Sequence, residues 1–165
     1  MLFTFVTNLK PKSRGEIQLR SDKYEDAPIV KTGYYSKKED LEKQNQVKYI
    51  EDFIRVTNTS FFKKTGGKWV NPKLSCCAHE EVGTTAYWKC YALCVMTTRR
   101  HYVGTCAMGS VVDSKLKVKG VNGLRVIDAS IMPVITSGDT NTPTVMIGEK
   151  ASDIIKEDYK LKING

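Results

Sequence analysis

Three short segments hold the residue types of this sequence that could perform chemistry. They are His101-Tyr-Val-Gly-Thr105, Asp128-Ala-Ser130 and Asn141-Thr-Pro143. His101 is one of only two histidines in the chain, and a neutral imidazole can take up a proton near neutral pH. The carboxamide of Asn141 can donate a hydrogen bond to an oxygen atom without changing its charge. Together these two groups could remove the proton of a hydroxyl group and bind its oxygen.

Each segment also has a structural interpretation. A single histidine near a helix end commonly serves the structure alone. An aspartate after a strand is commonly a turn former, and an asparagine before Thr-Pro is commonly a helix cap. Taken one at a time, these residues do not indicate a function, so the hypothesis depends on their combination and their order along the chain.

Two strands and one long helix are predicted for the first part of the chain. Residues 2–9 are largely apolar, and residues 15–20 alternate polar with apolar side chains, which is typical of strands. Residues 21–35 are polar and predict a loop. A Ser-Lys-Lys-Glu capping box at 36–39 predicts a helix from about 38 to 62. Its expected core-facing stripe comprises Ile50, Phe53, Ile54, Thr57 and Phe61.

In the second part, regular elements are predicted to position the three segments. A helix over about 84–98 would end just before His101. The dipeptide at 122–123, Asn-Gly, is typical of a hairpin turn, and a strand over 124–128 would carry the aspartate at its carboxyl end. Thr142-Pro143 would open the last helix, with the hydroxyl as its cap and proline in its first turn. The apolar stripe of that helix comprises Ile147, Ala151, Ile154 and Ile155.

Length and composition indicate a globular protein with one compact core. The chain has 165 residues, of which 41% are hydrophobic and 27% charged, values typical of soluble domains. No apolar run approaches the roughly 20 residues that span a bilayer, and the start lacks a basic leader. We therefore expect no membrane partner and no signal peptide. The net charge of +8 is spread along the chain, which favours a solvated basic surface over nucleic-acid binding.

Five cysteines leave at least one thiol without a disulfide partner. Four of them and a histidine could in principle surround zinc: Cys76, Cys77, His79, Cys90 and Cys94. However, the C-C-x-H and C-x3-C spacings match no standard zinc motif, so no metal site is predicted. In an oxidising compartment we expect one disulfide between the 76/77 pair and Cys90.

Long stretches around the three segments resemble a known family. The runs "HYVGTCAMG", "VVDSKLKVKGVNGLRVIDASIMP" and "GDTNTPTVMIGEKASDII" are similar to the C-terminal signature of the glucose–methanol–choline (GMC) oxidoreductases, FAD-dependent enzymes that oxidise alcohols. The runs "PKSRGEIQLRS" and "YYSKKEDLE" are similar to the opening of the family's substrate domain. The resemblance covers about residues 5–156 and is greatest to insect glucose-dehydrogenase-like members.

The resemblance implies an α+β fold that is part of the GMC fold. Residues 1–110 would form most of the substrate domain, an antiparallel sheet with packed helices. Residues 111–160 would supply the last strand and helix of the FAD domain, and 161–165 a tail. None of the twelve glycines belongs to a G-x-G-x-x-G motif, the family's cradle for the FAD pyrophosphate. We therefore expect the N-terminal dinucleotide-binding unit to be absent and the FAD site to be incomplete.

The resemblance also assigns roles to individual residues. His101 matches the family's catalytic base, and Asn141 matches its second active-site residue. Asp128 and Ala129 match positions that contact the phosphate and ribityl region of FAD. Asn141, Thr142 and Pro143 would lie at the flavin's pyrimidine edge, where a helix N-terminus stabilises the negative charge of the reduced ring. Tyr102 departs from the proline that commonly follows the family's histidine.

The expected function is thus the oxidation of a CH–OH group in an alcohol or sugar, with hydride transfer to FAD. The expected partners are that small substrate and the missing FAD-binding half, without which the chain is expected to be inactive. A non-catalytic binding or interaction module is the alternative, and a basic nucleic-acid binder is a third possibility. The family suggests an extracellular location, which the sequence itself does not specify.

Overall fold

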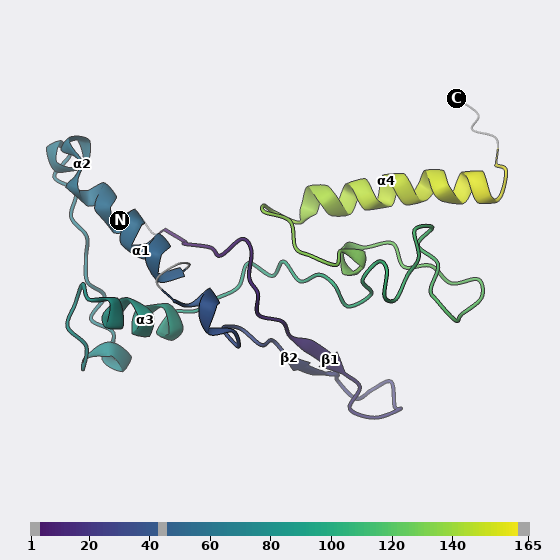
Figure 1. The fold of residues 1–165 in the computed structure, drawn as a ribbon, viewed down its shortest axis with the longest axis horizontal. Helices are drawn as coiled ribbons and strands as arrows, with labels where there is room; N and C mark the ends of the chain where they lie inside the picture. Colours follow the sequence, from purple (N-terminus) through teal and green to yellow (C-terminus); the bar gives the residue numbers. More distant parts are fainter. Residues whose placement is uncertain (1–3, 43–45, 162–165) are drawn as a thin grey trace. The chain divides into compact units, whose positions relative to one another are not determined.

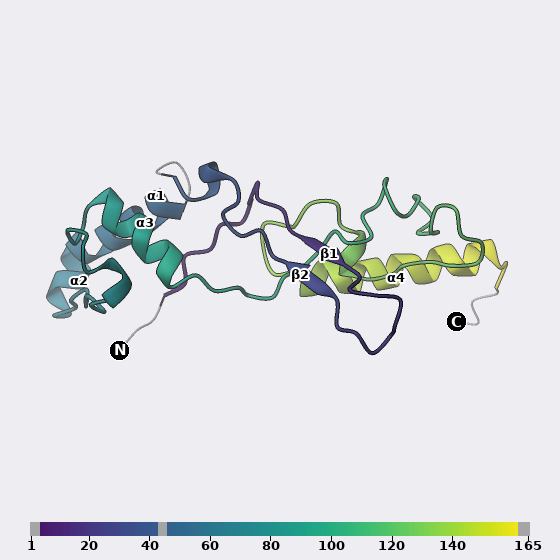
Figure 2. The ribbon, with the colours of Figure 1, turned by 90° about the horizontal axis from the view of Figure 1, so that it is seen from below.

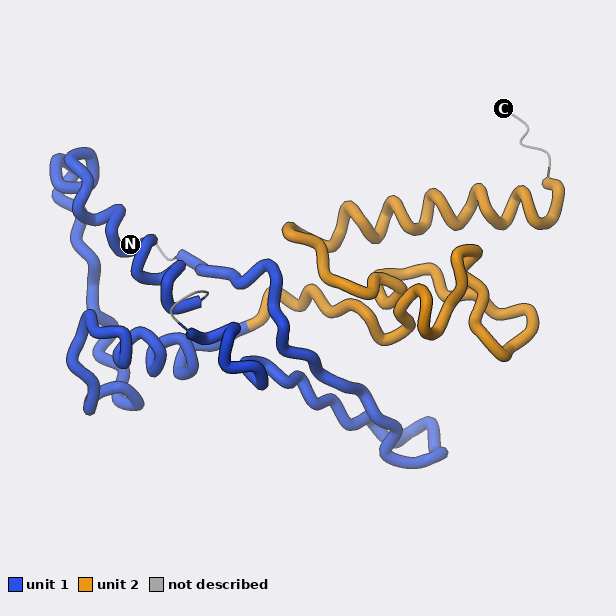
Figure 3. The backbone as a smooth tube through the Cα atoms, viewed as in Figure 1, with its two compact units in different colours: residues 1–97 blue, residues 98–165 orange. Residues whose placement is uncertain are grey.

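The computed structural model describes residues 4–42 and 46–161 (Figure 1). The chain forms two compact units, residues 1–97 and 98–165 (Figure 3). The boundary predicted at 110/111 divides the substrate domain from the part of the FAD domain. The two compact units do not test that division, so it stays a prediction. None of the helices within the described residues is long and apolar enough to cross a membrane.

A two-stranded antiparallel sheet is the only regular sheet within the described residues. Strand β1 (Glu16–Gln18) pairs with β2 (Ile29–Lys31), with Ile17 opposite Val30, and the two lie side by side in both views (Figures 1 and 2). The alternating run at 15–20 thus does contain a strand, but β2 lies in the predicted loop. Residues 4–9 of the predicted strand 2–9 are not a strand, because no other segment pairs with their backbone in the described chain; residues 2 and 3 lie outside it.

The long helix predicted from 38 to 62 is divided into four pieces. They are the 3-10 turn η1 (Lys38–Asp40), helix α1 (Gln46–Ile54), the 3-10 turn η2 (Arg55–Asn58) and helix α2 (Ser60–Lys64). Hydroxyl groups compete with the helical backbone at the junctions. Thr57 Oγ1 donates to the Ile54 carbonyl at 2.7 Å, and Thr59 Oγ1 donates to the Val56 carbonyl at 2.8 Å and accepts from the Phe62 amide.

The predicted capping box is therefore wrong, and the predicted stripe is only partly correct. Lys37 precedes η1, so Ser36 is not a cap. Ile50 is buried and Ile54 packs against the core. Phe53 and Phe61 are instead 42% and 76% exposed.

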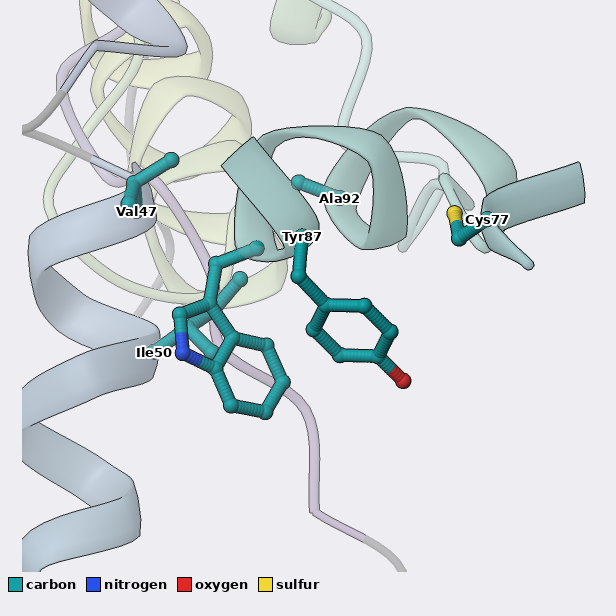
Figure 4. Close-up of a cluster of buried hydrophobic side chains, with 6 residues drawn as sticks. Val47, Ile50, Cys77, Tyr87 and Ala92 are labelled. Atoms are coloured by element: carbon teal, nitrogen blue, oxygen red, sulfur yellow. The ribbon is translucent and has the colours of Figure 1, made fainter. Parts of the chain in front are cut away.

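The core of the first unit joins α1 to helix α3 (Thr85–Cys94) (Figure 4). Its buried members are Val47, Ile50, Cys77, Tyr87, Trp88 and Ala92. Thr84 caps α3 by accepting the Tyr87 amide at 3.1 Å, as expected from a start near residue 84. The helix ends at Cys94 rather than 98, so His101 is not at its end.

Two disulfides tie α3 to the 3-10 turn η3 (Ser75–Cys77). Cys77–Cys90 is the predicted bridge, and Cys76–Cys94 is a second that was not predicted. All four sulfurs of the zinc hypothesis are thus in disulfide bonds, and Cys106 is a free thiol.

The second unit packs helix α4 (Asn141–Asp158) against a chain of turns and the 3-10 turn η4 (Ala129–Ile131). Its buried residues are Val112, Leu116, Ile131, Met132, Ile147 and Ala151. The predicted strand at 124–128 is wrong, because this segment makes only an isolated bridge from Lys117 to Arg125. The turn at 122–123 is correct, with Gly123 at φ +75°.

Candidate functional site

The segment that carries His101 is held against η4 by backbone hydrogen bonds. The amide of Cys106 donates to the Ser130 carbonyl at 3.0 Å, and that of Met108 donates to the Ile131 carbonyl at 2.8 Å. Gly104 makes the turn between His101 and these contacts with φ +93°, a conformation that costs glycine little. Two of the three predicted segments are therefore fixed side by side by the backbone.

Asp128 has the local role that its sequence context predicts. Its Oδ1 accepts the Ser130 amide at 2.7 Å and caps η4. The residue is exposed, and Ala129 is half-buried. The hydrogen bond fixes the direction of the carboxylate at the surface, directly before the turn that contacts the His101 segment.

The third segment forms the first turn of α4. Asn141, Thr142 and Pro143 are its first three residues, so the prediction that Thr142 caps the helix is wrong. Thr140 precedes the helix, and no side chain of the described residues caps it. Its carbonyl accepts the Thr144 amide at 3.1 Å and the Thr144 hydroxyl at 2.7 Å. Asn141 and Thr142 are exposed, which leaves the first amides of α4 open to an outside acceptor.

His101 lies beside the loop that leads into this turn. Its Nε2 is 3.5 Å from Oδ1 of Asp139, and the Arg99 guanidinium is 3.4 Å from the same oxygen. The imidazole is 26% exposed. Asp139 precedes Asn141 by two residues, so their Cα atoms are at most about 7 Å apart. The second unit thus brings the histidine to the loop that directly precedes the asparagine, although 40 positions separate the two residues along the chain.

Sequence reasoning missed Asp139 as a member of this cluster. Asp139 lies between Gly138 and Thr140, where an aspartate is commonly a turn residue. Its partner Arg99 lies 40 positions earlier and is itself 56% exposed, so no local pattern indicated the pair.

An apolar hollow of about 240 Å³ adjoins the start of α4. Pro143, Met146 and Ile147 line it from the helix, and Met132 and Thr136 line it from the preceding loop. The hydroxyl oxygen of Thr136 is buried and has no hydrogen-bond partner among the described residues. Buried hydroxyls are normally paired, so Thr136 lines this apolar hollow with one polar atom that the described residues leave unused.

Comparison with known proteins identifies the family. The family model of the GMC oxidoreductases matches residues 11–148. Over 157 residues the chain is 41% identical to the ecdysone oxidase of Bombyx mori, which covers 95% of this chain and 23% of that protein. It is 34% identical to the glucose dehydrogenase (FAD, quinone) of Drosophila melanogaster, covering 96% of this chain and 26% of that protein.

Solved structures agree with this result. An FAD-dependent oxidoreductase from Chaetomium thermophilum superposes with a TM-score of 0.79 at 28% identity, over 93% of this chain and 26% of that one. A formate oxidase of Aspergillus oryzae gives 0.77 at 25% identity, over 92% and 26%. The chain spans about a quarter of the length of these relatives. The resemblance seen in the motifs is thereby confirmed: the chain belongs to the GMC oxidoreductases, a family of FAD-dependent enzymes.

Proposed function

We propose that this chain is the C-terminal part of a flavin-dependent oxidoreductase that oxidises a CH–OH group of a small alcohol or sugar, with His101 as the base. The observation that carries the proposal is the position of the imidazole within the second unit. Its Nε2 lies 3.5 Å from Oδ1 of Asp139. Asp139 belongs to the loop that leads directly to Asn141, the first residue of α4, whose start has no side-chain cap.

The residues around this point fit the flavin end of FAD. The open amides of α4 suit the carbonyl oxygens of a pyrimidine edge, and the apolar hollow with the unpaired Thr136 hydroxyl suits a flat ring with polar edges. In the proposal, Asn141, Thr142 and Pro143 hold the pyrimidine edge. The carboxylate-bearing turn of Asp128 and Ala129 contacts the phosphate and ribityl region.

The reaction follows from the chemistry of these groups. When bound, the flavin supplies a hydride acceptor. His101 takes the proton of the substrate hydroxyl and becomes a cation, and the Asp139 carboxylate beside Nε2 stabilises that cation. The Asn141 amide donates a hydrogen bond to the substrate oxygen as negative charge develops on it. The apolar wall of the hollow excludes water from the reacting groups.

In the proposal, activity requires an FAD-binding half in addition to the residues of this chain. We therefore expect this chain alone to bind no flavin. Mixed with the FAD-binding half of a relative, it should give a yellow complex with flavin absorbance, which an oxidisable alcohol bleaches without oxygen. A mixture that takes up no flavin would contradict the proposal, and a monodisperse monomer in that mixture would support the non-catalytic binding module instead.

An oxidising location also belongs to the proposal. Two disulfides join η3 to α3, and disulfides persist in secreted proteins but are rare in the cytosol. We therefore assign the protein to the secretory pathway, which agrees with the extracellular location that the family suggested.

A further inference from the structure

One tripeptide in the first unit belongs to none of the three segments of the candidate site. Asn58-Thr59-Ser60 has the pattern Asn, any residue except proline, then a hydroxyl residue. Of the seven asparagines in the chain, only Asn58 meets this pattern. It is the acceptor pattern for N-linked oligosaccharides. We propose that Asn58 is an N-glycosylation site of this protein.

The fold leaves room for an oligosaccharide at this position. Asn58 is the last residue of η2, is exposed, and precedes α2. Within the described chain, η2 and α2 bury none of their residues. Thr59 caps α2 through its hydroxyl, and Ser60 is exposed at the first position of that helix. A bulky polar group on Asn58 would therefore displace no packed side chain.

The disulfides give an independent reason to expect the modification. Cys77–Cys90 lies partly in the core of the same unit, where Cys77 is 2% exposed. Disulfides form in the lumen of the secretory pathway. N-linked oligosaccharides are transferred to proteins in that same compartment. They are found on surface loops of secreted proteins.

The surroundings of Asn58 also suit a covering polar group. The apolar residues that flank it along the chain are exposed: Phe53 by 42%, Val56 by 44% and Phe61 by 76%. Exposed apolar side chains that a neighbouring molecule can contact favour association between molecules. An oligosaccharide that extends from Asn58 would shield them from other molecules.

The modification is a group transfer without redox change. The donor is an oligosaccharide carried on a lipid diphosphate. The side-chain nitrogen of Asn58 forms a bond to the anomeric carbon of the first sugar, and the bond from that carbon to the diphosphate oxygen breaks. The lipid diphosphate leaves with the electron pair, and the amide nitrogen loses one proton.

The test expresses the complete chain behind a secretory leader in insect cells. The wild-type chain should migrate more slowly than its own mass predicts, and an amidase that releases N-linked glycans should restore the faster migration and convert Asn58 to aspartate in the peptide map. Asn58→Gln and Ser60→Ala should each abolish the shift, whereas Ser60→Thr should keep it. Asn122→Gln, at an exposed asparagine outside the pattern, is the matched control and should also keep it.

The readout does not depend on correct folding, because the oligosaccharide is transferred as the chain enters the lumen. A chain with cleaved leader and formed disulfides that carries an unmodified Asn58 would overturn the proposal. So would a mobility shift that survives in Asn58→Gln. Because none of these outcomes involves flavin, the test is independent of the proposed oxidoreductase function.

Discussion

At the scale of single residues, two carboxylates have different roles: one pairs with cations of the candidate site, and the other stabilises the fold. Asp139 is exposed and pairs with Arg99 and His101 at 3.4–3.5 Å, so it acts on the candidate site with little effect on stability. Asp40 is 1% exposed and accepts the amides of Lys12 at 2.8 Å and Ser13 at 2.7 Å. It thereby fixes the chain that leads into β1.

Replacement of Asp40 by alanine should lower the free energy of unfolding by about 3 kcal/mol, because two amides lose a charged acceptor. Burial alone would raise the pKa of Asp40, but the hydrogen bonds from Lys12, Ser13 and Asn8 lower it below its ordinary value of 3.8. The carboxylate therefore stabilises the fold above about pH 4. This contribution disappears as the pH falls through the lowered pKa.

Urea unfolding at pH 7 and pH 3 measures this effect. The difference between wild type and Asp40→Ala should be largest at pH 7 and smaller at the acid pH. Asp22→Ala, at an exposed aspartate, serves as the control and should change stability little. An equal effect of the two substitutions would refute the role of Asp40.

The sequence selected the segments of the candidate site, but it did not predict all the residues that pair with them. The motifs selected His101, Asp128 and Asn141, and the structure brings these segments together within one unit. Asp139 and Asp40 were not foreseen, because each pairs with residues distant in the chain. Local patterns carry no information about such contacts.

At the scale of elements, the first unit depends on adjacent disulfides between the same two segments. Cys76–Cys94 encloses Cys77–Cys90, and the sulfurs of Cys76 and Cys77 are 3.7 Å apart. In the chain-entropy account, a disulfide stabilises by closing a loop in the unfolded chain. Either bridge alone closes nearly the same loop, so their effects should not add.

Removal of Cys76–Cys94 by Cys76→Ala and Cys94→Ala should therefore lower the free energy of unfolding by much less than the loss of an isolated disulfide would. Removal of both bridges should cost about 3 kcal/mol. Thermal unfolding of the two variants, with Cys106→Ala at the free thiol as control, measures the difference. If the losses from removing each bridge separately summed to the loss from removing both, this account of the unit would be wrong.

Helix α4 is fastened at its C-terminal end by one aspartate. Asp158 pairs with Lys115 at 2.8 Å, with Lys117 at 3.1 Å and with Arg125. The hydrogen bonds from Lys115 and Lys117 lower the pKa of Asp158 to about 2. These contacts hold the helix to the turns that precede η4, and so help to fix the direction in which its first turn points.

Asp158→Asn should lower the melting temperature of the chain at neutral pH. Because the folded pKa is below the unfolded one, the stabilisation is complete above about pH 4 and disappears as the pH falls through about 2. The difference from wild type in thermal unfolding should thus shrink over that window. Asp153→Asn is the matched control, since Asp153 is 57% exposed and lies 3.9 Å from Lys156. A difference between Asp158→Asn and wild type that does not change with pH would contradict the stabilising role of the Asp158 carboxylate.

The elements themselves were predicted unevenly for physical reasons. The last helix was correct because Ile147 and Ala151 recur at helical spacing and are buried in the core. The helix predicted from 38 to 62 forms only in pieces. At the break after α1, the hydroxyls of Thr57 and Thr59 donate to backbone carbonyls, which apolar periodicity does not register. The strand at 124–128 was wrong because strand propensity needs a partner segment to form a ladder.

At the scale of the whole molecule, the chain spans about a quarter of the length of its relatives. Exposed apolar side chains lie around the hollow, among them Val134 and Met146. In the proposal, the FAD-binding half packs on this apolar surface. The central claim is that His101 takes the substrate proton when that half is present.

The rate of flavin reduction by substrate, in the complete enzyme without oxygen, tests this claim most directly. His101→Ala should slow the reduction at least about 100-fold, the usual contribution of a positioned base. His79→Ala, at the other histidine, which is 70% exposed in the first unit, should leave the rate unchanged. A near-normal rate in His101→Ala would contradict the account, because another group would then take the proton.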